Sequence, residues 1–290
     1  MNAKLDADKF YFSVRGHSEF QVLRMPNGDI QKLAHPQNKE RLKAQCEKQK
    51  NFIVDSPQFF VCPVLNEFEL DEHYGFTMPF CRGEVAPEFI DRASPNKIRN
   101  FIQQLISLVE SFIASSEVRP VDSSHILNKS LSVKELMQQH PLSSPMLIRL
   151  IDDHLESVKA HKIFEIPIGK CHGDLTLSNM IFDDANDRYF LIDFLDSYLE
   201  SPILDLAKIS QETKLFWTSK LMSQTHDSAK YEIAMTVIDD KVQSHFLKYE
   251  WYKNYQPIFE FQNLIRVLPY AKDRDIIRAI IDRLHVLIKS

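Results

Sequence analysis

The chain has 290 residues, of which 44% are hydrophobic and 26% charged, proportions typical of a folded globular protein rather than a disordered or fibrous one. Its 35 basic and 40 acidic residues give a net charge of −5, which offers no electrostatic basis for binding nucleic acid or an anionic membrane surface. The N-terminal segment is polar, unlike a signal peptide, and no apolar run reaches the ~18 residues of a membrane span. We therefore expect neither a nucleic-acid nor a membrane partner.

The glycine and cysteine contents exclude several kinds of site. The spacing of the 6 glycines matches no Walker A loop, dinucleotide-binding fingerprint or nucleophile elbow. The four cysteines, Cys46, Cys62, Cys81 and Cys171, include no C-x-x-C pair. This pattern predicts buried, reduced thiols of a cytoplasmic protein, and neither a disulfide framework nor a zinc site. A nucleotide site in this chain would have to depend on side chains and metal.

The first 81 residues are predicted to form a small antiparallel sheet with one helix. Aromatic and β-branched residues indicate strands over 10–16 and 18–25, and the turn sequence Pro26-Asn27-Gly28-Asp29 leads into an alternating strand over 29–35. Ile30, Lys32 and Ala34 share one face of that strand. A charged helix is expected over 38–52, followed by strands over 58–65 and 73–80.

From about residue 83 the pattern becomes helical. Helices are predicted over 97–115, 132–140, 144–161, 203–217, 227–250, 257–269 and 272–288. Between them, NMIF and YFLIDF flank the polar turn DDANDR and predict one inserted hairpin within 166–197. The expected organisation is α+β, with a β-rich N-terminal lobe (1–81) and a larger, mainly α-helical C-terminal lobe (82–290) that contains the hairpin.

Polar residues with the spacing of a kinase site surround this hairpin. The segment CHGDLTLSN (171–179) places Asp174 five residues before Asn179, and Asp193 follows in IDF (192–194). Protein kinases carry H-R-D-x-x-x-x-N followed by D-F-G, with the same separation of Asp and Asn. Gly173 replaces the Arg of the first motif, and Leu195 replaces the Gly of the second.

These motifs resemble those of the aminoglycoside phosphotransferase and choline kinase family of small-molecule kinases, which carry H-G-D-x-x-x-x-N and then I-D-F/W. The resemblance implies a two-lobed, protein-kinase-like fold and an ATP- and Mg2+-dependent phosphotransferase that acts on a hydroxyl group of a small molecule. It implies that Asp174 is the catalytic base and that Asn179 and Asp193 are metal ligands, and their oxygen atoms are ligands suited to magnesium. His172 and Asp205 are expected to support the loop structurally.

The resemblance also implies that the N-terminal lobe binds the nucleotide. Lys32 on the third strand is the expected phosphate anchor, with an acidic partner on the next helix, for which Glu47 is preferred to Glu40. Met78 and Phe80 lie in the expected adenine-binding linker. The phosphate-covering loop would be 15–18, which has a single glycine.

The acceptor stays open between aminoglycoside, choline or ethanolamine, sugar and homoserine-type molecules. Helices after Asp205 are rich in aromatic residues, and we expect Trp251 and Tyr252 to be exposed near the acceptor, with Glu250, Glu260 and Asp239 favouring a cation. GTP in place of ATP, the role of Asp196 and the oligomeric state also stay open.

Two alternative functions are a protein kinase and an inactive, nucleotide-binding pseudokinase. The absence of an A-P-E motif and of room for a long activation loop disfavours the first alternative. The presence of Asp174, Asn179 and Asp193 together disfavours the second.

Overall fold

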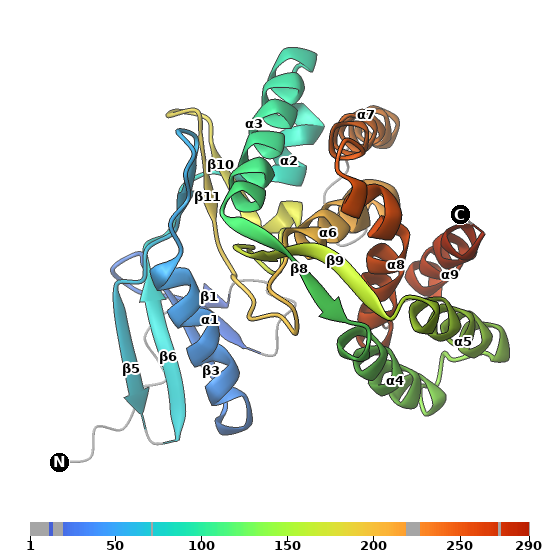
Figure 1. Ribbon diagram of the computed structural model, residues 1–290. Coiled ribbons are helices and arrows are strands. Elements are labelled where there is room, and N and C mark those ends of the chain that lie inside the picture. The colour runs from blue at the N-terminus through green and yellow to red at the C-terminus, as the bar shows by residue number, and fades with distance from the viewer. Residues whose placement is uncertain (1–11, 14–19, 71, 219–226, 272–273, 290) are drawn as a thin grey trace. The chain divides into compact units, whose positions relative to one another are not determined.

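The computed structural model describes residues 12–13, 20–70, 72–218, 227–271 and 274–289 (Figure 1). The contacts divide the chain into two units. The first contains the chain through Glu84 together with Met180–Asp196, and the second contains Val85–Asn179 and the chain from Ser197 onwards. The hairpin that we assigned by sequence to the C-terminal lobe therefore packs with the residues of the first unit.

The first unit contains a five-stranded antiparallel sheet in the order β1-β2-β3-β6-β5. The helix α1 packs against β6 and β3 (Figure 1). On β3 the burial alternates, so that Ile30, Lys32 and Ala34 are buried as the sequence predicted. The bounds of these elements are β1 Phe12–Ser13, β2 Gln21–Arg24, β3 Ile30–Ala34, α1 Lys39–Asn51, β5 Asn66–Leu70 and β6 His73–Met78, with a short 3-10 helix Pro36–Asn38 before α1.

A second sheet contains the predicted hairpin. Its order is β4-β11-β10-β7, and the bounds are β4 Phe59–Val61, β7 Glu84–Val85, β10 Met180–Asp183 and β11 Arg188–Leu191. The segment predicted as a strand of the antiparallel sheet, 58–65, instead pairs in parallel with β11, with Phe59 opposite Tyr189. Gly83 has a φ of 151°, and a Cβ there would lie 2.2 Å from the carbonyl oxygen of Phe182. This close approach of the backbone requires glycine.

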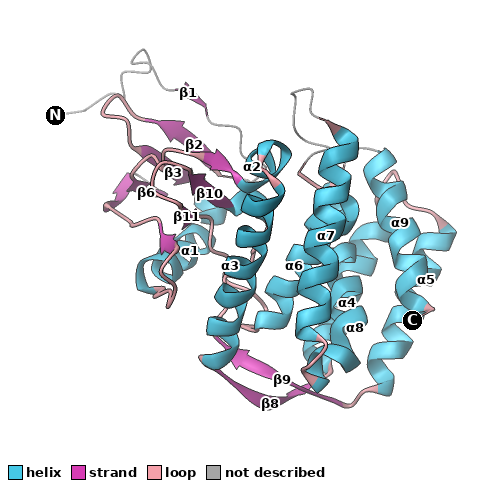
Figure 2. Ribbon diagram, turned by 90° about the horizontal axis from the view of Figure 1, so that it is seen from above, coloured by secondary structure: helices cyan, strands magenta, loops and turns pink. Residues whose placement is uncertain are grey.

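The second unit consists mainly of helices. Helices α3, α7, α6, α8 and α9 pack in succession, each against the next (Figure 2). The bounds are α2 Ala86–Arg92, α3 Pro95–Ala114, α4 Ser124–Gln138, α5 Pro145–Ala160, α6 Pro202–Leu215, α7 Ser228–Phe246, α8 Glu250–Val267 and α9 Arg274–Ile288, with 3-10 helices at Leu177–Asn179 and Leu268–Tyr270. The strands β8 (Ser116–Asp122) and β9 (Ile163–Gly169) form an antiparallel pair that the sequence analysis did not predict.

Two helices begin earlier in the structure than the sequence predicts. The helix predicted over 132–140 is the second part of α4, which begins at Ser124. The helix predicted to begin at residue 257 begins at Glu250, with Pro257 inside it. Proline removes one backbone donor from a helix, but the first turns of α8 bury Trp251 and Tyr252. We infer that this burial offsets the cost of the proline.

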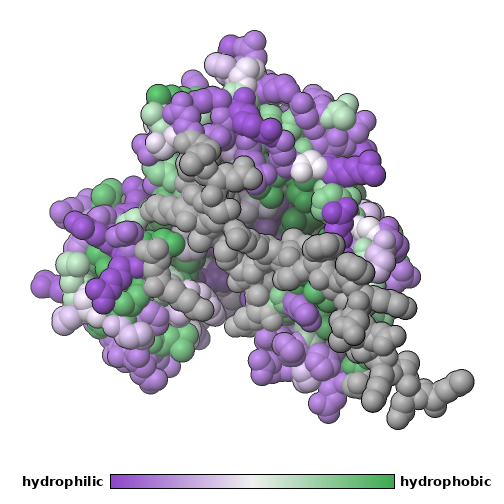
Figure 3. Space-filling model, turned by 180° about the vertical axis from the view of Figure 1, so that it is seen from behind, coloured by the Kyte–Doolittle hydropathy of each residue, from purple (hydrophilic) through white to green (hydrophobic). Residues whose placement is uncertain are grey.

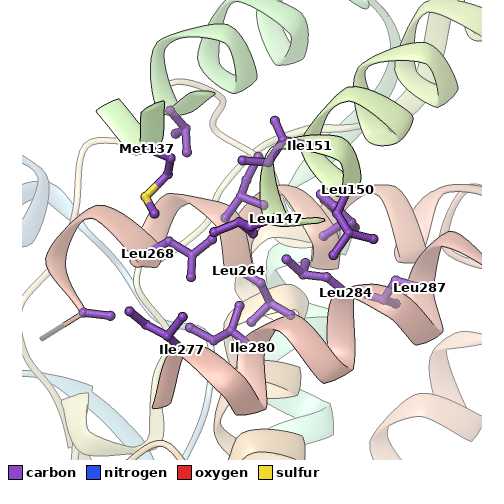
Figure 4. Close-up of a cluster of buried hydrophobic side chains, with 14 of the residues drawn as sticks. Met137, Leu147, Leu150, Ile151, Leu264, Leu268, Ile277, Ile280, Leu284 and Leu287 are labelled. Atoms are coloured by element: carbon purple, nitrogen blue, oxygen red, sulfur yellow. The ribbon is translucent and has the colours of Figure 1, made fainter. Parts of the chain in front are cut away.

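Hydrophobic residues, most of them on four helices, form a core of the second unit. Side chains from α4, α5, α8 and α9 interdigitate, including Met137, Leu147, Leu264 and Leu284 (Figure 4). On the face seen in Figure 3, polar residues predominate among the described residues, and hydrophobic residues are exposed in separate spots. Among the helices of the described ranges, none combines the length and hydropathy that crossing a bilayer requires.

The core of the second unit generates a stability prediction. Leu284 on α9 is fully buried, whereas Val286 on the same helix is 54% exposed. Leu284→Ala should lower the free energy of unfolding by about 2–5 kcal/mol, because the cavity left in the core adds to the lost burial. Val286→Ala should change it by less than about 0.5 kcal/mol. Urea unfolding followed by helical circular dichroism measures both, and similar losses for the two variants would contradict this description of the core.

Candidate active site

A buried carboxylate holds the loop that contains Asp174. Asp205, in the first turn of α6, accepts hydrogen bonds from the backbone N–H of His172 through Oδ2 at 2.6 Å and from that of Gly173 through Oδ1 at 2.8 Å. Asp205 is completely buried. The ring Nδ1 of His172 in turn accepts the backbone N–H of Asp174 at 3.2 Å. Asp205 and His172 therefore have the structural roles that the sequence analysis expected.

Asp174 carries a carboxylate with two polar partners. Lys208, one turn after Asp205 on α6, places its Nζ 3.0 Å from Oδ1. The amide Nδ2 of Asn179 donates to Oδ2 at 3.1 Å and to the backbone oxygen of Asp174 at 2.8 Å. Burial by itself would raise the pKa of Asp174, but the Lys208 ammonium and the Asn179 amide outweigh it and hold this pKa below its usual value. Asp174 is therefore ionised at neutral pH.

Asn179 has an oxygen atom that points away from these contacts. Its Nδ2 is engaged by Asp174, so the Oδ1 atom of the same planar amide faces another direction. Asn179 ends the 3-10 helix and immediately precedes β10, in which Met180 pairs with Leu191 of β11. Asp193 follows β11 by two residues. The register of one hairpin thus puts Asn179 and Asp193 at the same hairpin end.

Lys32 is buried in the first unit and paired with Asp193. Its Nζ lies 3.0 Å from Oδ1 of Asp193 and donates to Oε1 of Gln45 at 3.1 Å. The ring of Phe20 lies 4.9 Å from the same nitrogen. Lys32 is only 2% exposed. A buried ammonium needs such partners because desolvation is costly.

The partner of Lys32 on α1 is Gln45, which corrects the sequence prediction. Glu47 is exposed, lies 3.8 Å from Lys50 and accepts a hydrogen bond from Asn51 at 3.2 Å. Glu40 is also exposed. The buried face of α1 contains Leu42, Gln45, Cys46 and Gln49. This helical spacing is present in the sequence and indicates Gln45, whereas the kinase motif favours an acidic residue at this place.

Asp193 has a backbone conformation that is unusual for a residue with a side chain. Its φ is +59°, in the left-handed region. Such conformations are sparsely populated outside glycine and cluster at functional sites. The next residue, Phe194, is fully buried and its ring packs 4.7 Å from that of Phe52. Lys48 of α1 donates to the backbone oxygen of Leu195 at 2.9 Å. These contacts anchor the segment that directly follows Asp193.

The predicted nucleotide linker begins at the last residue of β6, Met78. Met78 is buried in the core of the first unit, whereas Phe80 is 42% exposed and has the guanidinium of Arg24 4.4 Å from its ring centroid. The predicted phosphate-covering loop, 15–18, lies outside the described residues. The assignment of Met78 and Phe80 to nucleotide binding stays a prediction.

The structure contradicts the expected acceptor aromatics. Trp251 and Tyr252 are buried, and Trp251 packs against Tyr249 with ring centroids 5.4 Å apart. Their charged sequence neighbours suggested exposure, but the helix turns both rings into the core. Glu260 is also buried, with Lys214 at 3.2 Å and Arg283 at 2.5 Å. Lys214 and Arg283 thus compensate the negative charge of Glu260 within the second unit.

The sequence analysis missed two further polar residues of α6. Lys208 is the partner of Asp174, and Glu212 lies one helical turn beyond Lys208. Glu212 is completely buried, and its Oε2 accepts a hydrogen bond from the Thr218 hydroxyl at 2.7 Å. Its Oε1 has no hydrogen-bond partner among the described residues. Burial raises the pKa of Glu212 to about 7, with a further contribution from the Asp174 charge.

Comparisons with known proteins identify a family and a fold. The family model of the phosphotransferase enzyme family matches residues 31–222. A solved GDP and kanamycin complex of APH(2")-IIia has a TM-score of 0.61 at 13% identity, with 96% of this chain and 93% of that chain covered. The GDP complex of wild-type aminoglycoside 2'-phosphotransferase-IIIa has a TM-score of 0.60 at 12% identity, with coverage of 97% and 93%. A search of curated protein sequences found no match. These similarities confirm the predicted fold class.

The raised pKa of Glu212 predicts a pH-dependent stability. Its folded-state pKa, about 7, lies above the ordinary value of 4.5, so the stabilisation from its bound proton is present below pH 4.5 and is lost as the pH rises through 7. Glu212→Gln removes this titration. The stability of the variant relative to the wild type should therefore rise by about 2–3 kcal/mol between pH 5 and pH 8.

Urea unfolding at the two pH values measures this difference. Glu156→Gln is the matched control, since the Glu156 side chain is 73% exposed. A pH dependence of Glu212→Gln that matches that of the control would show that Glu212 does not titrate in this way.

Proposed function

The chain belongs to the phosphotransferase enzyme family, and from this premise we propose that it transfers the γ-phosphate of ATP, with Mg2+, to a hydroxyl group of a small molecule. The observation that carries this proposal is the Asp174 carboxylate, which Lys208 and Asn179 keep ionised in a loop fixed by Asp205. Phosphoryl transfer depends mainly on positioning and charge neutralisation. A fixed, ionised carboxylate can orient an acceptor hydroxyl and accept its proton.

Two residues have the chemistry to hold magnesium. Asn179 directs its Oδ1 away from Asp174, and Asp193 contacts Lys32 through Oδ1, so that Oδ2 lies outside this ion pair. Oxygen ligands of this kind, completed by phosphate oxygens and water, suit Mg2+. When bound, the metal neutralises the charge of the phosphates. The described residues contain no cluster of three or more His, Cys, Asp or Glu side chains that could hold a metal ion. The proposed site would therefore have only Asn179 and Asp193 as protein ligands.

Lys32 is proposed to bind the phosphates. Its ammonium is buried beside Asp193, and Gln45 orients it without adding a negative charge. Among the described residues, Asp193 is therefore the only negatively charged hydrogen-bond partner of Lys32. An incoming phosphate would compete with this carboxylate for Lys32, while Asp193 would turn to the metal.

We place aminated alcohols and aminoglycoside-like molecules first among the acceptors. Kanamycin occupies a structure with a similar fold, and the Asp174 carboxylate carries a negative charge at the proposed site. Only eight residues separate Asp193 from the start of α6 at Pro202, which leaves no long activation loop and disfavours a protein kinase. A screen of aminoglycosides, choline, ethanolamine and sugars, each with ATP or GTP and Mg2+, tests this class.

The role of Asp174 is tested by an isosteric change. Asp174→Asn should retain the fold and nucleotide binding but lower kcat by about 10²–10⁴-fold, because the amide cannot accept the proton. Asp184→Asn, in the exposed turn between β10 and β11, is the control and should keep wild-type turnover. Phosphate transfer is measured with the best acceptor of the screen. Turnover within threefold of wild type for Asp174→Asn would overturn its assignment as the base.

The phosphate anchor is tested separately. Lys32→Met should raise the nucleotide KM by about 10- to 100-fold, the value of one charge-assisted hydrogen bond, and leave the acceptor KM unchanged. Lys43→Met is the control, because Lys43 is half exposed and lies 3.8 Å from Glu69 at the surface. Steady-state kinetics with each substrate varied in turn provide both constants. An unchanged nucleotide KM in Lys32→Met would place the anchor elsewhere.

A further inference from the structure

Two of the four cysteines lie side by side in the first unit. The Sγ atoms of Cys62 and Cys81 are 3.1 Å apart and share a hydrogen bond. Cys62 directly follows β4, and Cys81 lies in the linker after β6. Both thiols also approach the backbone oxygen of Pro79, at 3.6 and 3.9 Å. A disulfide bond is about 2.0 Å long, so the sulfur atoms need to approach each other by only about 1 Å.

The two thiols differ in accessibility and in the direction of their pKa shifts. Cys62 is completely buried, whereas Cys81 is 9% exposed and is among the residues that line a pocket of about 450 Å³, with Arg82, Arg188 and Phe190. The hydrogen bond shared with Cys62 and the nearby Arg188 lower the pKa of the Cys81 thiol, against the opposing effect of burial. The same hydrogen bond raises the pKa of Cys62. A thiol of lowered pKa at a pocket, beside a second thiol, has the arrangement of a redox-sensitive pair.

We propose that Cys62 and Cys81 are a redox modification site, at which hydrogen peroxide converts the two thiols into a reversible intramolecular disulfide. The Cys81 sulfur attacks one peroxide oxygen, which forms an S–O bond, breaks the O–O bond and releases water, leaving Cys81 as a sulfenic acid. The Cys62 sulfur then attacks the Cys81 sulfur, which forms the S–S bond, breaks the S–O bond and releases a second water. The two thiols together lose two protons and two electrons, and a dithiol reductant restores them by exchange.

The disulfide would join the two ends of one segment of the first unit. Cys62 and Cys81 are 19 residues apart, and β5 and β6 lie between them. Oxidation also removes both S–H donors from the Pro79 oxygen. If the linker binds the nucleotide base, as the proposed function has it, oxidation should raise the nucleotide KM by about tenfold, the effect of one lost hydrogen bond. The formation of the disulfide itself does not depend on that function.

The native chain provides the first test, without any variant. The folded protein is treated with a small excess of peroxide, denatured, alkylated with iodoacetamide and mapped by mass spectrometry of its peptides. We expect the four cysteines to be alkylated in the reduced protein, and a linked Cys62–Cys81 peptide pair to appear after oxidation and disappear with dithiothreitol. Cys62 and Cys81 both remaining alkylatable after peroxide, or oxidation found only at Cys46 or Cys171, would overturn the proposal.

Variants separate the order of the two steps. Cys62→Ser should leave Cys81 as a sulfenic acid that dimedone labels, whereas Cys81→Ser should abolish labelling of the pair. Cys46→Ser, at another fully buried thiol, should form the Cys62–Cys81 disulfide as the wild type does. Dimedone labelling of Cys62 in Cys81→Ser would reverse the assigned roles and overturn the mechanism. A disulfide that forms without any change in the nucleotide KM would instead refute the role of the linker in the proposed function.

Discussion

The hydrogen bonds from the His172 and Gly173 backbone to the buried Asp205 carboxylate are the constraint on which the loop that contains Asp174 depends. A carboxylate that accepts two N–H groups in a dry environment is stabilised as an anion and holds its donors in one geometry. Because Asp205 opens α6, the same helix brings Lys208 to Asp174 and Glu212 one turn further. Through Lys208, the position of α6 therefore contributes to the lowered pKa of the residue that we propose as the base.

The first unit uses a comparable arrangement around a cation. Lys32 is buried by the alternation of β3 and held by Gln45 and Asp193. A glutamate at residue 45 would neutralise this ammonium within the unit, whereas glutamine only orients it. The charge on Lys32 is then shared with Asp193, the residue we propose as a metal ligand. The backbone of Asp193 lies in the left-handed region, a conformation that persists where surrounding contacts hold it.

Local patterns predicted the elements that depend on local physics. The two-residue alternation of 30–34 placed Lys32 on the buried face, and the two apolar runs around a polar turn predicted the hairpin of β10 and β11. The pairing of β8 with β9 was missed because their partners are far apart in the sequence. The parallel pairing of β4 with β11 was missed for the same reason, since register between distant segments is not encoded in either segment alone.

The sequence by itself determined the family and the fold class, and it indicated Asn179 beside Asp174 but not Lys208, because motif spacing reflects the reach of a loop and a hairpin but not the partner on a distant helix. It could not determine which side chains meet. Glu47 is charged but faces solvent, whereas the neutral Gln45 reaches Lys32. Trp251 has charged neighbours but is buried. Cys62 and Cys81 are separated by two strands and still touch. In each case the contact depends on which side of a helix faces the core or on which strands pair in the folded chain. Burial favours apolar groups and polar groups with a partner, whatever residues are next to them in the sequence.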